Sequence, residues 1–154
     1  MDAIGELRSD HRVIEARLRE LRDTSAKASR RRRKLFKAAA EDVARHLDLE
    51  EQLVFPIAER EGDAKAVVLK AVEQHAVVRH VLTELSSTGP QEEVFGPRVE
   101  VLADLLHAHF IEEQRTVYPP LRTALTRRQL RALAERIRQG REAIADPQDY
   151  LRTT

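Results

Sequence analysis

The sequence contains no cysteine and no tryptophan, and it has only five glycines, six prolines and 4% aromatic residues. Without cysteine, the chain can form no disulfide bond and offers no thiolate to a metal ion. Glycine and proline stand mostly at the ends of segments, and the segments between them are rich in alanine, leucine, glutamate and arginine. This residue mix favours helices over strands, so the composition predicts an all-α fold.

The sequence also lacks a long hydrophobic run and a strong net charge. No apolar segment approaches the ~20 residues that span a bilayer, and residues 1–6 include acidic side chains where a secretory signal has an apolar core. The 27 lysines and arginines nearly balance the 26 aspartates and glutamates, so no overall field attracts nucleic acid or anionic lipid. The basic run at residues 30–34 has no aromatic residues interleaved with it and is typical of a solvated helix start. We therefore predict a cytoplasmic protein with no nucleic-acid or membrane partner.

Apolar residues recur at steps of three and four in five segments, the spacing that forms one stripe along a helix. The four longer stripes cover residues 4–21, 36–57, 68–85 and 95–116, and a shorter one lies within residues 126–145. Polar or glycine-containing turns separate the long stripes, at residues 24–29, 61–63 and 86–90, and Gly62 suits the left-handed turn after a helix. Short connections between long helices imply antiparallel neighbours.

Together these segments predict a single domain over residues 1–154. Its main part is an antiparallel up-down-up-down four-helix bundle over about residues 2–120. A short additional C-terminal helix over about residues 126–145 is expected to dock outside the bundle, and Asp146 and Pro147 are expected to end it.

Histidine or glutamate fills the gaps in all four long stripes. The gap residues are His11, His46, Glu50, His75, His109 and Glu113. Each glutamate follows a histidine by four residues, and this spacing places both side chains on the same helix face, about one turn apart. The histidines on either side of a connection lie at similar distances from it, so all of these side chains can converge on one layer.

Burying these residues in an apolar core requires a source of positive charge. An unpaired ionised carboxylate is penalised by several kcal/mol there, even after relaxation, and the same stripes contain no obvious set of lysines or arginines that would neutralise both glutamates. A pair of metal ions would supply the charge, and imidazole and carboxylate ligands suit iron, manganese or zinc. The remaining histidines, His80 and His107, fall on other helix faces and are predicted to lie at the surface. We therefore predict a metal site formed by the gap residues.

The two halves of the chain repeat this pattern. Each half has one helix with a single histidine, followed by one helix with the motif His-x-x-x-Glu. The second motif continues to Phe55-Pro56 in the first half and to Tyr118-Pro119 in the second. A pseudo-twofold axis between the halves would give each metal ion a similar set of ligands.

At these residues the sequence resembles the hemerythrin-like family, also called the HHE cation-binding domain, over roughly residues 4–122. The complete order His, His-x-x-x-Glu, His, His-x-x-x-Glu, with its Phe-Pro and Tyr-Pro endings, carries the resemblance. It implies a non-haem centre of two oxo- or hydroxo-bridged iron ions, with Glu50 and Glu113 as bridging carboxylates and with manganese or zinc as less favoured ions. It also implies reaction with dioxygen, hydrogen peroxide or nitric oxide.

Two positions depart from the oxygen-carrying hemerythrins, which have a further histidine where this chain has Arg79 and an aspartate where it has Gln114. Fewer histidines leave more coordination positions for water or a reactant, as catalysis at a metal requires. The resemblance therefore favours redox chemistry, with catalase- or peroxidase-like turnover of hydrogen peroxide as one form. A non-enzymatic module that senses or binds iron, oxygen or nitric oxide, with an unidentified protein partner, is an open alternative. A bundle without metal is another.

Several residues beside the motifs have two interpretations. Glu51 and Glu112 either support the site from outside or are exposed. Arg79 either lies near the site or extends to solvent. Tyr118 is about half a turn from the ligand face of a straight helix, so we predict that it packs, and a kink near Pro119 is the alternative that would direct it to the site.

Overall fold

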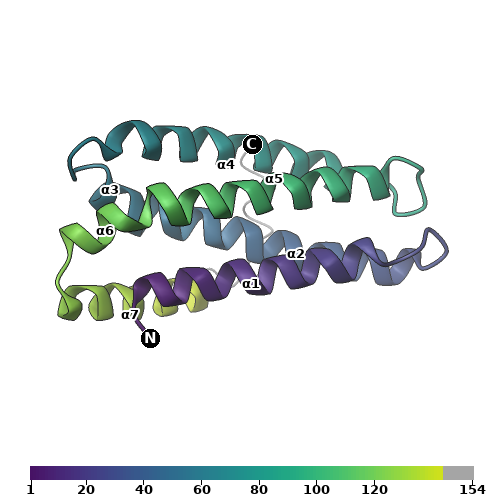
Figure 1. The fold of residues 1–154 in the computed structure, drawn as a ribbon. Helices are drawn as coiled ribbons and strands as arrows, with labels where there is room; N and C mark the ends of the chain where they lie inside the picture. The colour runs from purple at the N-terminus through teal and green to yellow at the C-terminus, as the bar shows by residue number, and fades with distance from the viewer. Residues whose placement is uncertain (144–154) are drawn as a thin grey trace.

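The computed structural model describes residues 1–143 of the chain, and over these residues it is helical without strands. Four long helices form an antiparallel bundle (Figure 1): α1 (Ala3–Arg22), α2 (Ser29–Leu49), α4 (Ala64–Ser86) and α5 (Phe95–Thr116). Another helix, α7 (Arg127–Ala143), packs against α1 and α2 on the outside of the bundle. The predicted all-α bundle with an additional C-terminal helix is confirmed. The predicted end of that helix, near Asp146 and Pro147, lies outside the described residues, and the single domain over residues 1–154 stays a prediction.

Two helices of the bundle change geometry just after their glutamate. Helix α2 continues through one π-helical turn, η1 (Glu50–Val54), into α3 (Phe55–Ala58), and α5 breaks at Val117 and continues as α6 (Tyr118–Ala124). Proline is the second residue of α3 and of α6. Because a proline inside a regular helix removes a hydrogen bond and clashes with the carbonyl one turn earlier, the chain departs from α geometry before each proline.

The buried apolar residues form two separate clusters. One includes residues of α3, α6 and α7, and the other contains only residues of α1, α2, α4 and α5. On α1, Leu7 belongs to the first cluster and Ile14 to the second, and the buried His11 lies between them. Burying one such leucine or isoleucine stabilises the fold by roughly 1.5–3 kcal/mol, so the clusters hold the helices together on both sides of a polar layer. No helix within residues 1–143 combines the length and the apolar character that a membrane crossing needs.

Individual residues fix two of the connections. Gly62 has the left-handed φ, 49°, that the sequence predicts for the turn before α4. The guanidinium group of Arg32 donates hydrogen bonds to the carbonyl oxygens of Thr24 (2.9 Å) and Pro90 (2.7 Å), and so joins the α1–α2 and α4–α5 connections at one end of the bundle. Arg32 is only 9% exposed, so the interpretation of the basic run as a solvated helix start was wrong for this residue.

The C-terminal helix docks through an apolar face and two arginines. The buried residues of the face are Leu130, Leu133, Ala134 and Ile137. Beside them, Arg138 and Arg141 donate hydrogen bonds of 2.6 and 2.7 Å to the carboxylate of Glu6 on α1. Burial alone would raise the pKa of Glu6, but the hydrogen bonds and charges of Arg141 and Arg138 outweigh it and hold the pKa below its ordinary value of 4.5. Ionised Glu6 therefore stabilises the docked helix.

The docking of α7 is expected to weaken in acid. A carboxyl group whose pKa is lowered by folding stabilises the folded state fully above its unfolded value, and the contribution is lost as the pH falls through the lowered value. We expect Glu6→Gln to reduce the free energy of unfolding by about 1 kcal/mol at neutral pH. The difference from the unmodified protein should shrink below about pH 4.5. Urea unfolding of both proteins over a range of pH, with a chelator present, measures this difference in the free energy of unfolding. A difference that does not change with pH would contradict a role for the Glu6 charge.

Candidate metal centre

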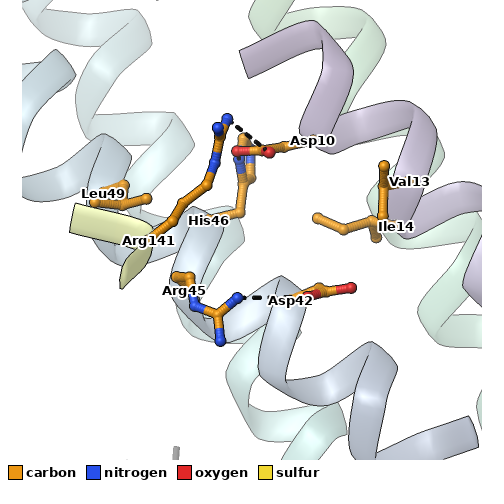
Figure 2. Close-up of a pocket in the computed structure, with 8 residues that line it drawn as sticks. All are labelled: Asp10, Val13, Ile14, Asp42, Arg45, His46, Leu49 and Arg141. Carbon is orange, nitrogen blue, oxygen red and sulfur yellow. Dashed lines mark hydrogen bonds and ion pairs between the residues drawn. The ribbon is translucent and has the colours of Figure 1, made fainter. Parts of the chain in front are cut away.

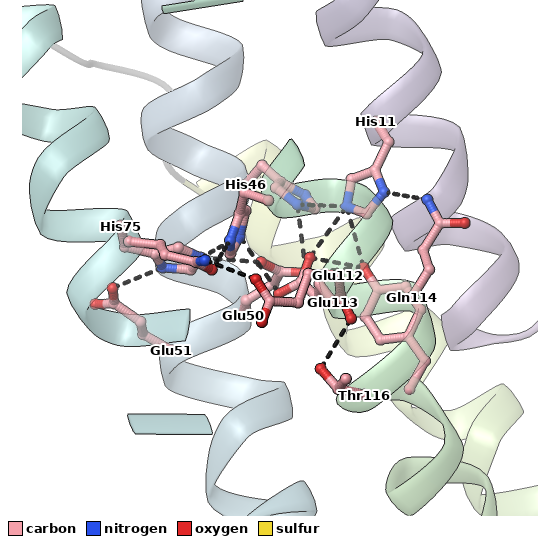
Figure 3. Close-up of polar contacts among 12 residues, drawn as sticks. His11, His46, Glu50, Glu51, His75, Glu112, Glu113, Gln114 and Thr116 are labelled. Atoms are coloured by element: carbon pink, nitrogen blue, oxygen red, sulfur yellow. Dashed lines mark hydrogen bonds and ion pairs between the residues drawn. The ribbon is translucent and has the colours of Figure 1, made fainter. Parts of the chain in front are cut away.

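The gap residues of the four apolar stripes meet in one buried layer across the bundle (Figure 3). They form two groups that share two carboxylates: His11, His46, Glu50 and Glu113 in one, and Glu50, His75, His109 and Glu113 in the other. Within each group, one potential ligand atom of every residue lies within 4.8 Å of the others. Each of these side chains belongs to a residue at most 2% exposed. We call the groups the His11/His46 half-site and the His75/His109 half-site.

In each half-site the Nε2 atoms of the two imidazole rings point toward each other. Nε2 of His11 lies 3.1 Å from Nε2 of His46, and Nε2 of His75 lies 3.0 Å from Nε2 of His109. The rings meet nearly edge to face, with interplanar angles of 80° and 74°. Equivalent nitrogen atoms therefore point toward a common centre, and the neutral imidazole nitrogen is a common metal ligand.

Each glutamate extends into both half-sites. One carboxylate oxygen of Glu50 lies 3.3 Å from Nε2 of His46, and the other lies 3.5 Å from Nε2 of His75. Glu113 has the same arrangement: Oε2 lies 3.3 Å from Nε2 of His11, and Oε1 lies 3.7 Å from Nε2 of His109. Both carboxylates thus have one oxygen on each side, the arrangement expected of a group that bridges two metal ions in a helical bundle.

Two of the imidazoles are held from outside by carboxylates. Asp10 on α1 lies 3.2 Å from Nδ1 of His46, and Glu51 in η1 lies 2.9 Å from Nδ1 of His75. A carboxylate that accepts the Nδ1 proton fixes the orientation of the ring and leaves Nε2 available to a metal. Of the two interpretations of Glu51, the structure therefore favours the one in which it supports the site from outside.

The other two imidazoles contact amide groups. Gln74 lies 2.7 Å from Nδ1 of His109, and Gln114 lies 2.9 Å from Nδ1 of His11. We did not predict Gln74, Gln114 or Asp10 as part of the site, although the internal repeat contains them. In both halves, the residue before the single histidine contacts the other histidine of its own half. The residue after the glutamate contacts the single histidine of the opposite half.

Tyr118 also enters the cluster. It is 1% exposed, and its hydroxyl group donates to Glu50 at 2.9 Å. The same oxygen lies 3.3 Å from Glu113 and 3.1 Å from Nε2 of His11. The interpretation of Tyr118 as a packing residue was therefore wrong, and the alternative of a kink near Pro119 applies.

The break in α5 explains the position of Tyr118. The chain leaves α geometry at Val117, whose φ is −98°, and the next turn places Tyr118 on the ligand face instead of half a turn away. The equivalent residue of the repeat, Phe55, packs against the ring of His75 with 5.2 Å between centroids. The Phe-Pro and Tyr-Pro endings thus bring one aromatic ring to each half-site, but only the tyrosine adds a hydroxyl group.

The Tyr118 hydroxyl is expected to stabilise the metal-free cluster. Tyr118→Phe keeps the ring and removes the donor to the buried carboxylates, and a buried acceptor that loses its partner costs about 1–3 kcal/mol. We expect the free energy of unfolding of the chelated protein to fall by about 2 kcal/mol, measured by urea unfolding. A loss below about 0.5 kcal/mol, typical of inert surface substitutions, would mean that the hydroxyl only lies near the carboxylates.

Within residues 1–143, the two shared carboxylates have no basic partner other than the histidines. Among the described residues, their ion pairs are with imidazoles, and neither lysine nor arginine contacts them. Oε2 of Glu50 and Oε1 of Glu113 are buried and accept no hydrogen bond within residues 1–143. Burial and the charge of Glu50 raise the pKa of Glu113 well above its ordinary value, so protonation relieves part of the charge in the absence of metal. Since an uncompensated buried charge is strongly destabilising, the positive charge that balances two ionised carboxylates has to come from the imidazoles or from metal ions. The donor set therefore fits a pair of cations.

The imidazoles have strongly shifted pKa values. Burial opposes protonation of His46, but the charge of Glu50 outweighs it and raises the pKa of His46 to about 10. Burial and the charge of His46 lower the pKa of His11 to about 2. In the other half-site, carboxylates outweigh burial and raise the pKa of His75, whereas burial and the charge of His75 lower the pKa of His109 to about 4. Each half-site thus concentrates one positive charge between its two rings.

The remaining predicted neighbours lie outside the cluster. Arg79 donates a hydrogen bond of 2.7 Å to Glu51, so it lies beside the site without entering it. Glu112 accepts a hydrogen bond of 2.8 Å from one of the two supporting glutamines. His80 and His107 are exposed, and neither belongs to a group that could hold a metal ion within the described residues.

Comparisons with known proteins were made for both the sequence and the structure. Residues 2–121 match the family model described as the hemerythrin HHE cation binding domain. The structure is similar to the crystal structure of a hemerythrin HHE cation binding domain-containing protein from Mycobacterium kansasii, with a TM-score of 0.80 and 25% sequence identity over 100% of this chain and 94% of that chain. A comparison with curated protein sequences finds no match. The matched residues of the family model include both half-sites, whereas α7 follows them.

Proposed function

We propose, because this chain belongs to the hemerythrin HHE cation binding domain family, that its buried cluster holds two iron ions and reacts with dioxygen, hydrogen peroxide or nitric oxide. The family match and the two His/Glu groups support a bound metal. Iron is preferred to manganese or zinc because the order of the motifs resembles that of non-haem iron proteins. Bound iron would supply the one-electron chemistry that these small molecules require.

The shared carboxylates carry the proposal. Glu50 and Glu113 each present one buried oxygen to each half-site. A single ion would leave the second oxygen of each carboxylate buried without a cation, whereas two ions use both oxygens. The proposed ligands are His11 and His46 for one ion, His75 and His109 for the other, and Glu50 and Glu113 as bridges.

The surroundings of the cluster favour small reactants. The proposed ligands are at most 2% exposed, so a large organic substrate cannot reach them without displacing a helix. Burial and the charges of Glu113 and Glu50 raise the pKa of Tyr118 well above its ordinary value. Its hydroxyl group therefore keeps its proton and stays a hydrogen-bond donor at the edge of the cluster. The burial of the proposed ligands favours turnover of hydrogen peroxide itself over oxidation of bulky donors.

Metal analysis of the purified protein, expressed with iron supplied, tests the proposal. We expect two iron ions per chain, and an absorption band of a bridged iron pair. One ion per chain would contradict the bridging assignment, and two manganese or zinc ions would contradict the choice of iron. A folded protein that takes up no metal after anaerobic reconstitution would overturn the proposal.

A peroxide assay distinguishes an enzyme from a binding module. The iron-loaded protein is expected to evolve oxygen from hydrogen peroxide faster than the same concentration of free iron. Glu100→Ala, which removes an exposed carboxylate from the same helix as Glu113, is the matched control and should keep the full rate. Reversible binding of nitric oxide or dioxygen without peroxide turnover would instead support a sensor.

A further inference from the structure

We propose that α7 supports the His11/His46 half-site: Arg141 fixes the carboxylate of Asp10, and Asp10 fixes the ring of His46. This inference rests on the proposed metal centre and gives a positioning role to a helix that follows the matched residues 2–121. Figure 2 shows the three side chains together, with Arg141 reaching from α7 to Asp10 on α1.

Asp10 connects Arg141 to His46 through its two oxygens. Oδ2 of Asp10 lies 3.2 Å from Nδ1 of His46, and Oδ1 forms an ion pair of 2.8 Å with Nη2 of Arg141. Nη1 of Arg141 donates to Glu6 at 2.7 Å, so the guanidinium group is held on two sides. A carboxylate fixed in this way keeps its second oxygen as the acceptor of the Nδ1 proton of the imidazole, and so leaves Nε2 directed to the metal.

The three residues line a small recess on the outer side of the half-site. It has a volume of about 50 Å³ and lies between α1, α2 and α7 (Figure 2). About 10–15 Å³ of such space is enough to admit one water molecule, so the recess admits water. Removing the guanidinium group would enlarge this space, and water would compete for the oxygens of Asp10.

A glycine lets α7 approach closely at this point. Gly140 precedes Arg141, and glycine is a poor residue for a helix interior. A methyl group at position 140 would overlap Cδ2 of Leu49, which directly precedes Glu50 on α2. Gly140 thus allows the contact that brings Arg141 to Asp10.

The other half-site has the same support from within the bundle. Glu51 lies 2.9 Å from Nδ1 of His75 and accepts a hydrogen bond of 2.7 Å from Arg79 on α4. In each half-site, one histidine is therefore backed by a carboxylate and an arginine, and the other is backed by a glutamine. The parallel assigns to Arg141 the part that Arg79 has in the second half-site.

Stepwise titration with Fe(II) under anaerobic conditions, against a competing chelator, tests the inference. Loss of an outer partner commonly weakens metal binding about 10–100-fold, so we expect Arg141→Gln to weaken one of the two binding steps about tenfold and to leave the other unchanged. The Mössbauer spectrum of the loaded variant should show a change at one iron only. Arg138→Gln is the matched control, because Arg138 contacts Glu6 and Glu135 but not Asp10, and both of its binding steps should equal those of the unmodified protein.

The outcomes separate this inference from the proposed function. If the unmodified protein fails to bind two ions, the proposed function fails and this inference with it. If the unmodified protein binds two ions and Arg141→Gln leaves both binding steps unchanged, only the inference is overturned. The same conclusion follows if Arg138→Gln weakens the two steps as much as Arg141→Gln does. Should Arg141→Gln lose helix content in the metal-free protein, Asp10→Ala decides the question with the same expected loss, because it leaves the apolar face of α7 intact.

Discussion

Replacing Glu50 by alanine is expected to abolish the binding of both metal ions. The Glu50 carboxylate has one oxygen in each half-site, so its removal takes a ligand from both at once. Outer-shell substitutions already weaken metal binding about 10–100-fold, and loss of a shared ligand should weaken it by more than about 100-fold. Metal content after gel filtration and the absorption of the bridged iron pair measure the loss, and Glu113→Ala should give the same result.

Control variants separate loss of a ligand from loss of the fold. Glu73 on α4 and Glu100 on α5 are exposed, and alanine at either position should leave the metal content unchanged. Circular dichroism of the chelated proteins shows whether Glu50→Ala still forms the bundle. Unchanged iron content in a folded Glu50→Ala variant would falsify the bridging role of Glu50.

Removal of the metal is expected to lower the thermal stability of the protein strongly. A ligand that binds only the folded state stabilises it by roughly 2.7 kcal/mol at about 100 times its dissociation constant and by roughly 4 kcal/mol at about 1,000 times. For a chain of this length, each kcal/mol shifts the midpoint temperature Tm by about 2–4 °C, so chelation should lower Tm on the order of 5–15 °C. Calorimetry of the iron-loaded and chelated proteins measures the shift.

The same measurement on Glu50→Ala is the control for this expectation. If the stabilisation arises from metal in the cluster, the chelator should leave the Tm of this variant unchanged. An equal response of both proteins to the chelator would place the stabilising ion elsewhere. Re-addition of iron to the chelated unmodified protein should restore its Tm.

The sequence was sufficient to predict the bundle and the meeting of the gap residues. Steps of three and four set the buried face of each helix, and the four-residue spacing of His46 and Glu50 follows the helix period directly. The same rule failed for Tyr118, because its direction depends on the backbone angles at Val117 and not on spacing. The proline that follows Tyr118 indicated that a kink could occur there, since a regular helix does not accept it, but not the direction that the kink gives the side chain.

The supporting residues divide into those that the sequence contained and those that it did not. Asp10 and Gln74 stand at the same position of the repeat, as do Glu51 and Gln114, so the repeat would have identified all four. Arg141 belongs to neither half of the repeat. The partner of Arg141 depends on how α7 docks on the bundle. The helical period shows that a residue lies at the edge of an amphipathic helix, but it does not show which carboxylate that residue contacts.

The polar layer divides the apolar core into two clusters, and this division has a kinetic consequence. Without metal, the cluster that includes α3, α6 and α7 can open while the other keeps α1, α2, α4 and α5 together, because local unfolding proceeds in contiguous cooperative units. Such an opening exposes the ligands from one end of the bundle. Uptake of the proposed ions would then be expected to depend on how often that end opens, and not on diffusion of the ions. Two ions bound to the proposed ligands would connect the four helices, and the amide hydrogens of both clusters would then be expected to exchange with solvent as one cooperative unit.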